Sequence, residues 1–348
     1  MRERGLMIDL RSDGVTRPTP GMRRAIAAAE VGEDQFGEDP SVNHLQDVTK
    51  DLLSKEAALW VPTGTMANQM AIRLMTRPGD DVIVAREAHV AWHEAGGSSA
   101  NSGVQFTEIG QDGVFTARAL MSSVKPQGHL VYPPTTLVIV ENTHNRAGGT
   151  VFPQDEVSRI CSAAKERRVA TFLSGARLWH AAVASGLSVR DLAAPFELVS
   201  VSLSKGLGAP GGAMLAGTAR LIARAVRVRR MFGGAMRQVG FFAAAGLYAI
   251  EHHVDRLVED HANARLIAER LAQSPRIRID VATVQTNIIR FALTDEAPDA
   301  SAVVERAAEG GVLFFGFDKD TMRIVTHLDV DAGQCARAAE VIVGAIES

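Results

Sequence analysis

The stretch SKGLGAPGG, residues 204–212, follows directly on the apolar run LVSVSL, residues 198–203. A lysine that leaves a buried strand for a glycine-rich loop can have its amine desolvated, which lowers the pKa of the amine and frees it for Schiff-base chemistry. The flanking glycines would let the backbone pass close to a flat ring. Lys205 could equally be a solvated lysine beside a flexible turn, so this stretch alone leaves both interpretations open.

Short apolar runs alternate with longer helical patterns on both sides of this loop. We expect strands at 57–62, 81–85, 136–141, 170–173, 198–203 and 213–216, and helices between them at, for example, 64–75 and 155–166. This alternation predicts an α/β fold with a mostly parallel sheet that is covered on both faces. Ligands bind such sheets at the carboxyl ends of the strands.

A long helical pattern begins near Phe241, and a smaller α+β unit follows it, with strands expected at 286–292 and 322–327. The sequence therefore predicts an N-terminal arm at residues 1–15, a large domain at 16–250 and a small C-terminal domain at 251–348. We expect residues 1–6 to be a short extension that precedes the folded domains.

The composition narrows the class of protein. With 46% hydrophobic and 22% charged residues, the chain of 348 residues is typical of a globular protein large enough for two domains. The net charge of −3 gives no reason to expect nucleic acid or an anionic membrane as a partner. Two cysteines are too few for a disulfide-held secreted scaffold, and no secretory signal or membrane span is visible, so we expect a cytoplasmic protein.

A second motif, TGTMAN at residues 63–68, follows an expected strand and opens an expected helix. The amides of Gly64, Thr65 and Met66 at a helix N-terminus, with a threonine hydroxyl beside them, could cradle a phosphate group. A Gly-Thr pair often merely caps a helix. Both uses need the same geometry, so they are not exclusive.

Nine segments in this order resemble those of low-specificity threonine aldolases, which are pyridoxal 5'-phosphate (PLP) enzymes of the aspartate-aminotransferase-like fold. They are MIDLRSD from Met7, VGEDQFGEDPSVNHLQ from Val31, PTGTMANQ from Pro62, EAHVAWHEAGG from Glu87, ENTHNRAGG from Glu141, GARLWHAAVA from Gly175, SLSKGLGAPGG from Ser202, GGAMRQ from Gly233 and MRIVTHLDV from Met322. The resemblance implies a lyase that converts β-hydroxy-α-amino acids such as threonine to glycine and an aldehyde. It also implies a homo-oligomer, dimer or tetramer, with shared active sites.

The resemblance further implies roles for individual residues. Lys205 matches the Schiff-base lysine, and His89 matches the imidazole that stacks on the cofactor ring. His144 matches a second histidine near the substrate hydroxyl. Either histidine could take the hydroxyl proton, since imidazole titrates near neutral pH. A lone histidine is more often a structural hydrogen-bonding residue.

Four basic residues and one serine match positions that bind anionic groups in the family. Arg177 and Arg323 match arginines near the cofactor ring oxygen and the substrate carboxylate, a group that suits the guanidinium fork. Ser12 matches a residue near the same carboxylate. Arg230 and Arg237 match residues that reach the phosphate site of the neighbouring subunit, although the basic run before Arg230 could also be a solvated helix face.

The main departure from the family pattern is Ser174, which stands where the family has the aspartate that pairs with the pyridine nitrogen of PLP. A serine carries no charge, so we expect a largely neutral ring nitrogen. Three interpretations follow: an aldolase with a weaker electron sink, a changed reaction, or an impaired homologue. Phe36, Gly14 and His180 are smaller departures, which indicate a pocket of altered shape and polarity.

Other classes of function fit less well. His89 and His93 have the spacing of zinc ligands on a helix, and Glu94 follows, but no third ligand has a fitting position, so no metal site is expected. A nicotinamide dehydrogenase would need a G-x-G-x-x-G motif after an early strand, and none is present. A dimeric binding protein that holds PLP without turnover stays open because of Ser174.

Overall fold

The computed structural model describes residues 7–126 and 128–348. Its largest element is a seven-stranded sheet of order β2-β8-β7-β6-β5-β3-β4. Neighbouring strands run parallel except at β8, which is antiparallel to both β2 and β7. The strands are β2 (Ala57–Val61), β3 (Asp81–Ala85), β4 (Gln105–Ile109), β5 (Thr135–Glu141), β6 (Ala170–Gly175), β7 (Leu198–Ser202) and β8 (Ala213–Gly217).

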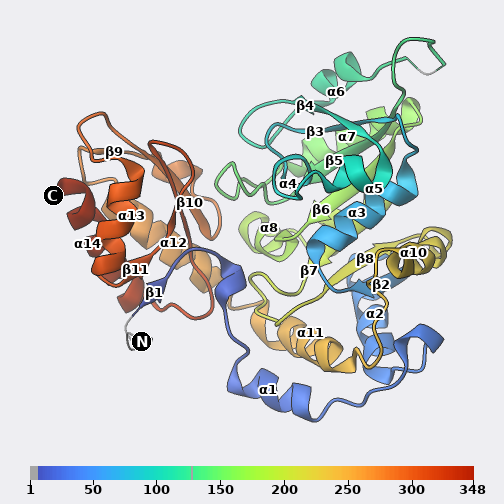
Figure 1. Ribbon diagram of the computed structural model, residues 1–348, viewed down its shortest axis with the longest axis horizontal. Helices are drawn as coiled ribbons and strands as arrows, with labels where there is room; N and C mark the ends of the chain where they lie inside the picture. Colours follow the sequence, from blue (N-terminus) through green and yellow to red (C-terminus); the bar gives the residue numbers. More distant parts are fainter. Residues whose placement is uncertain (1–6, 127) are drawn as a thin grey trace.

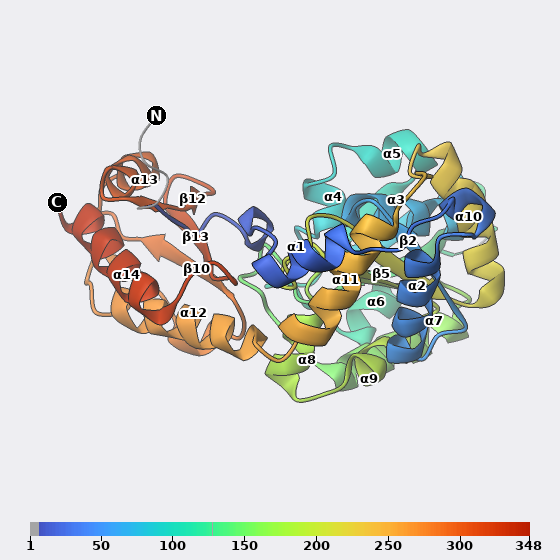
Figure 2. The same cartoon turned by 90° about the horizontal axis from the view of Figure 1, so that it is seen from below.

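The α-helices surround this sheet and a smaller one (Figures 1 and 2). In chain order they are α1 (Pro20–Ala27), α2 (Pro40–Leu53), α3 (Gly64–Met75), α4 (His89–Trp92), α5 (Gly97–Ser102), α6 (Ala117–Ser123), α7 (Gln154–Glu166), α8 (Leu178–Ser185), α9 (Val189–Ala193), α10 (Ala219–Met231), α11 (Gly240–His253), α12 (Leu257–Leu271), α13 (Ala300–Glu309) and α14 (Ala332–Glu347).

Both faces of the large sheet are buried. In β3, Val82 and Val84 pack with residues of α3 and α10 on one face. Ile83 and Ala85 belong to a second core on the other face, with residues of α2, α7, α8 and α11. Successive side chains of a strand point to opposite faces, so a strand covered on both sides must be apolar throughout. This explains why the central strands appear in the sequence as continuous apolar runs.

A second, antiparallel sheet of order β12-β13-β10-β9 forms a separate lobe, which is orange to red in Figure 1. Its own core includes Ile289, Phe291 and Ile324 together with residues of α12, α13 and α14. The strands are β9 (Ile277–Arg278), β10 (Ile288–Leu293), β12 (Phe315–Gly316) and β13 (Thr321–Val325).

Residues 8–10 belong to this C-terminal lobe instead of forming a free arm. Strand β1 (Ile8–Asp9) pairs in parallel with β11 (Val312–Leu313). Leu10 is fully buried in the core of the lobe. The alternation Ile8-Asp9-Leu10 places two apolar side chains on the same face of an extended segment, which explains the docking. Residues 1–6, expected to be an extension, lie outside the described residues.

The long helical pattern from Phe241 is divided into two helices, α11 and α12. Ala249 of α11 is buried in the core of the large sheet, whereas Ile267 of α12 is buried in that of the C-terminal lobe. Because each helix buries its apolar face in a different core, the chain bends between them, at residues 254–256. This bend supports a domain division near residue 250, which we keep as a proposal. Over the described residues, no helix is long and apolar enough to cross a membrane.

Candidate active site

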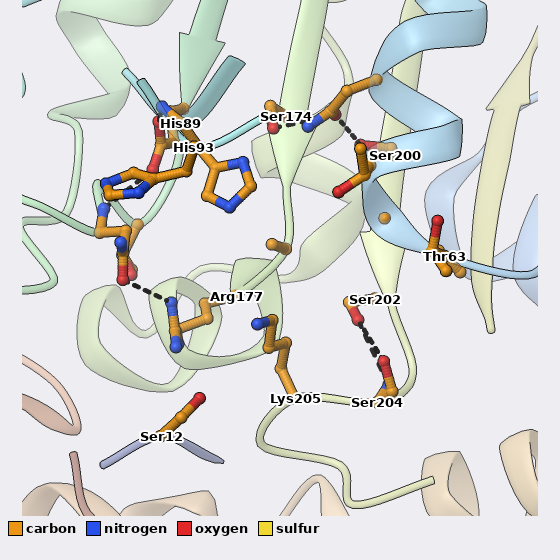
Figure 3. Close-up of a pocket in the computed structure, with 18 of the residues that line it drawn as sticks. Ser12, Thr63, His89, His93, Ser174, Arg177, Ser200, Ser202, Ser204 and Lys205 are labelled. Atoms are coloured by element: carbon orange, nitrogen blue, oxygen red, sulfur yellow. Dashed lines mark hydrogen bonds between the residues drawn. The ribbon is translucent and has the colours of Figure 1, made fainter. Parts of the chain in front are cut away.

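A cavity of about 470 Å³ opens at the carboxyl ends of the strands of the large sheet (Figure 3). Ligands of open α/β sheets bind at this edge. The structure brings eight of the predicted site residues to the wall of this cavity: Ser12, Gly64, Thr65, His89, Ser174, Arg177, Lys205 and Arg323.

Lys205 lies just after β7, and its side chain reaches into the cavity (Figure 3). Burial lowers the pKa of its amine below the ordinary value, and the positive charges of Arg177 and Arg323 add to this, while Asp13 acts in the opposite direction. A lowered pKa increases the fraction of neutral amine, which is the form that attacks a carbonyl carbon. The structure therefore favours a desolvated lysine over a solvated turn residue.

Two glycines of the loop after Lys205 are required by close packing. A Cβ atom at Gly206 would lie 2.2 Å from Nε2 of His180, and one at Gly212 would lie 2.6 Å from Nε1 of Trp60. Gly212 also has a φ of +100°, which residues with a side chain rarely adopt. These glycines let the loop pass close to protein side chains, whereas the sequence alone predicted close approach to a flat ring.

Arg323 extends from β13 into the same cavity. Its Nη2 donates to the carbonyl oxygen of Arg11 at 3.2 Å, and its Nε is buried without a hydrogen-bond partner in the described part of the chain. Burial and the charge of Arg177 lower the pKa of Arg323 to about 10. A buried cation in this state is stabilised by an anion, and its planar fork matches a carboxylate.

Arg177 is held by Asp13, a residue that sequence analysis did not select. Its Nε and Nη2 each donate to one oxygen of the Asp13 carboxylate at 2.7 Å, and its Nη1 donates to Oδ1 of Asn145 at 3.2 Å. Burial alone would raise the pKa of Asp13, but the charge and hydrogen bonds of Arg177 hold it well below its usual range. A guanidinium has five N–H donors, and these bonds use three of them, while Arg177 itself lines the cavity.

The N-terminus of α3 forms one side of the cavity. The hydroxyl of Thr63 caps this helix by accepting a backbone N–H at 3.0 Å. Gly64 and Thr65 follow at the cavity wall, and a Cβ atom at Gly64 would meet nothing within 4 Å. Ser202 and Ser204, whose hydroxyls lie 3.3 Å apart, also line the cavity (Figure 3). Free amides at a helix N-terminus attract a phosphate group, so capping and phosphate binding can occur together here.

His89, the first residue of α4, is oriented by two carboxylates. Its backbone N–H donates to Oε2 of Glu141 at 2.6 Å, and its ring Nδ1 lies 2.9 Å from Oε1 of the buried Glu94. A carboxylate only accepts hydrogen bonds, so Nδ1 carries the hydrogen and Nε2 of the neutral ring is left as an acceptor. His93 lies beside it at 5.5 Å between ring centroids, with its pKa lowered by burial and by His89.

Ser174, at the end of β6, lies near Ser200 of β7 at the cavity wall (Figure 3). Both hydroxyls donate to Oδ1 of Asn68, at 3.1 Å from Ser174 and 3.3 Å from Ser200. Nδ2 of Asn68 in turn donates to Oε1 of Glu94 at 2.7 Å. The serine that departs from the family pattern is therefore connected to a buried carboxylate through an amide.

Comparison with known proteins assigns the chain to a family that agrees with this site. The model of the family described as Beta-eliminating lyase matches residues 9–294. This chain belongs to the beta-eliminating lyase family. It is 39% identical over 335 residues to the low specificity L-threonine aldolase of Escherichia coli strain K12, covering 96% of this chain and 97% of that protein. The resemblance to threonine aldolases that the sequence motifs indicated is confirmed.

Solved structures show the same fold. The threonine aldolase of Leishmania major superposes with a TM-score of 0.80 at 20% identity, covering 96% of this chain and 98% of that chain. A structure of SPT with PLP superposes with a TM-score of 0.74 at 16% identity, covering 97% of this chain and 87% of that chain. These likenesses confirm the predicted fold class, and together with the family they imply PLP as the cofactor.

The cavity of this beta-eliminating lyase fits PLP in three respects. The free amides at Gly64 and Thr65 suit its phosphate group, and the largely buried amine of Lys205 suits its aldehyde. The hydroxyl of Ser174, at the position that matches the partner of the ring nitrogen in the family, also belongs to the cavity wall and would face the cofactor ring.

Four other predicted residues do not line this cavity. His144 is buried against a second cavity, with its Nε2 at 3.9 Å from Oε2 of Glu141, and Glu141 itself lines the first cavity. The sulfur of Met66 packs close to Gly234. Arg230 is exposed, and Arg237 pairs at the surface with Glu33 at 2.7 Å. The functional roles of these residues stay predictions.

The structure adds residues that sequence reasoning missed as site components. Asp13, Asn68 and Glu94 contact predicted site residues, and Phe317 packs under the guanidinium of Arg323 at 5.2 Å. Asp13 and Asn68 have partners far away in the sequence, Arg177 and Ser174, whereas Glu94 and Phe317 lie within six positions of His89 and Arg323. For Asp13, Asn68 and Glu94, the signal that could have identified them is a polar residue inside a quoted family segment, close in sequence to a predicted site residue.

The three smaller departures have different surroundings. Phe36 is 75% exposed, and Gly14 has room for a side chain, since an added Cβ atom would come no closer than 3.5 Å to Ser12. His180 is fully enclosed, with Nδ1 at 2.9 Å from Nε2 of His261. Burial lowers the pKa of His180 to about 3. His180 therefore supports the loop of Lys205 as a neutral imidazole.

Proposed function

We propose that this protein is a PLP-dependent lyase that reversibly cleaves β-hydroxy-α-amino acids, such as threonine and allo-threonine, into glycine and an aldehyde. One observation carries the proposal: a largely buried amine, Lys205, and a buried guanidinium with an unpartnered Nε, Arg323, share one cavity of about 470 Å³. The amine suits a carbonyl cofactor, and the guanidinium suits the carboxylate of an amino acid.

PLP supplies, when bound, an aldehyde that condenses with amines and a conjugated ring that stabilises negative charge at Cα. Lys205 would anchor it, and the amides of Gly64 and Thr65 would hold its phosphate group. Arg323, with the hydroxyl of Ser12 beside it, would bind the carboxylate of the substrate. This placement would orient the Cα–Cβ bond of the substrate for cleavage.

His89 is the residue that we propose takes the proton of the substrate hydroxyl. Glu94 accepts from Nδ1, so Nε2 is the free basic atom and belongs to a ring that lines the cavity. His93 lies beside it and is the second candidate. His144 lines a different cavity, so a role for it would have to be exerted through Glu141.

The alternative is a homologue that binds PLP with a changed or impaired reaction, and Ser174 is the observation that favours it. An uncharged hydroxyl gives a bound ring less electrostatic support than a carboxylate would. Replacement of Ser174 by aspartate distinguishes the two. A large gain in glycine release from threonine would favour the impaired homologue, whereas a small change would favour a working aldolase.

We also propose that the protein is a cytoplasmic homo-oligomer, a dimer or tetramer, in which Arg230 and Arg237 complete the phosphate site of a neighbouring subunit. Arg230 is exposed and Arg237 is 64% exposed at its side chain, which leaves both accessible to another copy. Substitution of both by glutamine is expected to weaken PLP binding without changing the fold of the subunit. Unaltered PLP affinity would contradict the shared site.

The test of the proposed function is product formation. Purified protein with PLP is expected to release equal amounts of glycine and acetaldehyde from threonine, and Lys205→Ala should abolish the reaction. Lys165→Ala, at an exposed lysine of α7, is the matched control and should keep full activity. The absence of glycine release with every β-hydroxy-α-amino acid tested, despite bound PLP, would contradict the proposal.

A further inference from the structure

A chain of hydrogen bonds connects a buried carboxylate to the serines of the cavity wall. We call Glu94, Asn68, Ser174 and Ser200 the Glu94 relay. The side chain of Glu94 is completely buried, and it accepts at Oε1 from Asn68 at 2.7 Å. Oδ1 of Asn68 accepts from Ser174 at 3.1 Å and from Ser200 at 3.3 Å. All four residues are buried, so their hydrogen bonds to one another satisfy groups that have little contact with bulk solvent.

The direction of each hydrogen bond in the relay is determined at Glu94. An ionised carboxylate has no hydrogen to donate, so Asn68 must turn its NH₂ group towards Glu94 and its Oδ1 towards the serines. Oδ1 can only accept, and each serine has a single hydrogen, so both hydroxyls donate to Asn68. Ser174 and Ser200 therefore present only lone pairs to the cavity.

Other neighbours hold Glu94 in its role as an acceptor. Oε1 also accepts from Nδ1 of His89 at 2.9 Å, and Oε2 accepts from Nε2 of Gln69 at 2.7 Å. Gln69 is held in this orientation because its Oε1 accepts from Asn101 at 3.3 Å. A proton on Glu94 would leave one of these donors without an acceptor, which is costly in a buried site.

This polarity selects what the serine oxygens can bind. A ring nitrogen without a proton would face lone pairs on Ser174 and Ser200 and would be buried without a hydrogen bond. A protonated ring nitrogen would donate to Ser174 and be satisfied. A buried polar group without a partner is destabilised, so the hydrogen bonds available at Ser174 favour the N–H form.

We propose that the Glu94 relay makes Ser174 an obligate hydrogen-bond acceptor, so that the bound cofactor has a protonated ring nitrogen although no carboxylate stands at position 174. Glu94 and Asn68 act as positioning residues in this arrangement. The inference rests on the proposed function, because it requires PLP in the cavity. The sequence alone predicted a neutral ring nitrogen, because that prediction took account of the serine side chain but not of its hydrogen-bond partners. The inference predicts the opposite protonation state.

The test uses the full-length protein loaded with PLP that is isotope-labelled at the ring nitrogen and observed by nitrogen NMR. The chemical shift of a pyridine nitrogen moves far upfield on protonation, so it reports the protonation state independently of activity. The wild-type protein is expected to show the shift of a protonated nitrogen. Asn68→Leu frees the serine hydroxyls, and Ser174→Ala removes the acceptor, so each should move the shift towards the unprotonated range.

Asn263→Leu is the matched control, because it replaces a buried asparagine of α12 whose Nδ2 donates to the carbonyl oxygen of Val330 and which has no part in the relay. Its shift should equal that of the wild type. If Asn68→Leu does not fold, Ser174→Ala remains as the variant that tests the relay. Bound PLP with an unprotonated nitrogen in the wild type, or an unchanged shift in both relay variants, would overturn the inference but leave the proposed function standing. Failure to bind PLP would overturn both.

Discussion

His89 is the residue on which proton transfer depends in the proposed reaction. We expect His89→Asn to lower kcat by roughly 10²–10⁴-fold, the usual contribution of general acid–base catalysis. PLP should stay bound, because Lys205 and the N-terminus of α3 hold it independently. Steady-state kinetics with threonine measures the effect, and the visible absorbance of PLP confirms loading.

His129→Asn serves as the control for this substitution, since His129 is exposed on the surface. It should leave kcat unchanged. A decrease of less than about threefold in the PLP-loaded His89 variant would be too small for a general base. In that case His93, the other imidazole of the cavity, becomes the candidate.

Arg323 is predicted to bind the substrate carboxylate. Arg323→Gln removes the charge and should raise KM for threonine by roughly 10–100-fold, because a hydrogen bond to a charged group contributes about 1.5–3 kcal/mol. Arg290→Gln is the matched control: Arg290 is the register partner of Arg323 on β10 and is exposed. An unchanged KM in the Arg323 variant would show that the carboxylate binds elsewhere.

His180 makes the stability of the protein sensitive to acid. Its pKa in the folded protein is about 3, below the ordinary 6.5, because burial disfavours the charged ring. As the pH falls below about 6.5, the unfolded chain binds this proton first, so the free energy of unfolding decreases until the pH approaches 3. One such group contributes at most about 1.4 kcal/mol per pH unit.

The measurement is urea denaturation between pH 7 and pH 4. We expect His180→Asn, which does not titrate, to show a weaker loss of stability with falling pH than the wild type. Equal pH dependence in both proteins would mean that His180 is not held neutral in the folded state.

The loop after β7 is the element that carries Lys205, and it tolerates little change. We expect Gly206→Ala to destabilise the protein by about 1–3 kcal/mol, the usual cost of overpacking, because the added Cβ atom would lie 2.2 Å from Nε2 of His180. It should also weaken PLP binding by displacing Lys205. Denaturation and PLP titration of the same sample measure both effects.

Gly344→Ala is the control for the Gly206→Ala substitution. Gly344 lies in α14, and an added Cβ atom would meet nothing within 4 Å. Alanine is the better helix former, so this variant should be more stable by about 0.5–1 kcal/mol. A Gly206 variant as stable as the wild type would show that the loop has room to move.

Continuous apolar runs made most of the large sheet predictable. β3 and α3 have the predicted bounds, and β2, β5, β6, β7 and β8 begin and end within two residues of those expected. β4 was not predicted, because it is an edge strand whose residues 105–109 are all exposed or half-buried. The antiparallel direction of β8 was also not predictable, since apolar alternation does not encode strand direction.

The site was predictable only where a residue belongs to a local motif. Lys205 stands in a loop and Gly64 at the start of α3, each within a stretch of characteristic sequence. The interactions of Asp13 and Asn68 join residues 164 and 106 positions apart, Arg177 and Ser174 respectively. Such tertiary contacts have no signature in the pattern of a single sequence. The hydroxyl of Ser174 is oriented by Asn68, and this contact cannot be read from the residue type at position 174. The sequence alone therefore predicted a neutral ring nitrogen.

At the scale of the whole molecule, the cavity is assembled from both lobes. The large sheet supplies Lys205 and Ser174, whereas Arg323 comes from β13 of the C-terminal lobe. Ser12 follows β1, which is paired with β11 in that same lobe. The groups proposed to bind the substrate carboxylate therefore lie on one lobe, and those proposed to bind the cofactor lie on the other.

The central claim is that the amine of Lys205 binds the aldehyde of PLP. The most direct measurement is to load the protein with PLP, reduce it with borohydride, digest it and locate the adduct by mass spectrometry. We predict a single phosphopyridoxyl group on Lys205, lost in Lys205→Ala. An adduct on another lysine, or no adduct under conditions that reduce a control PLP enzyme, would contradict the account.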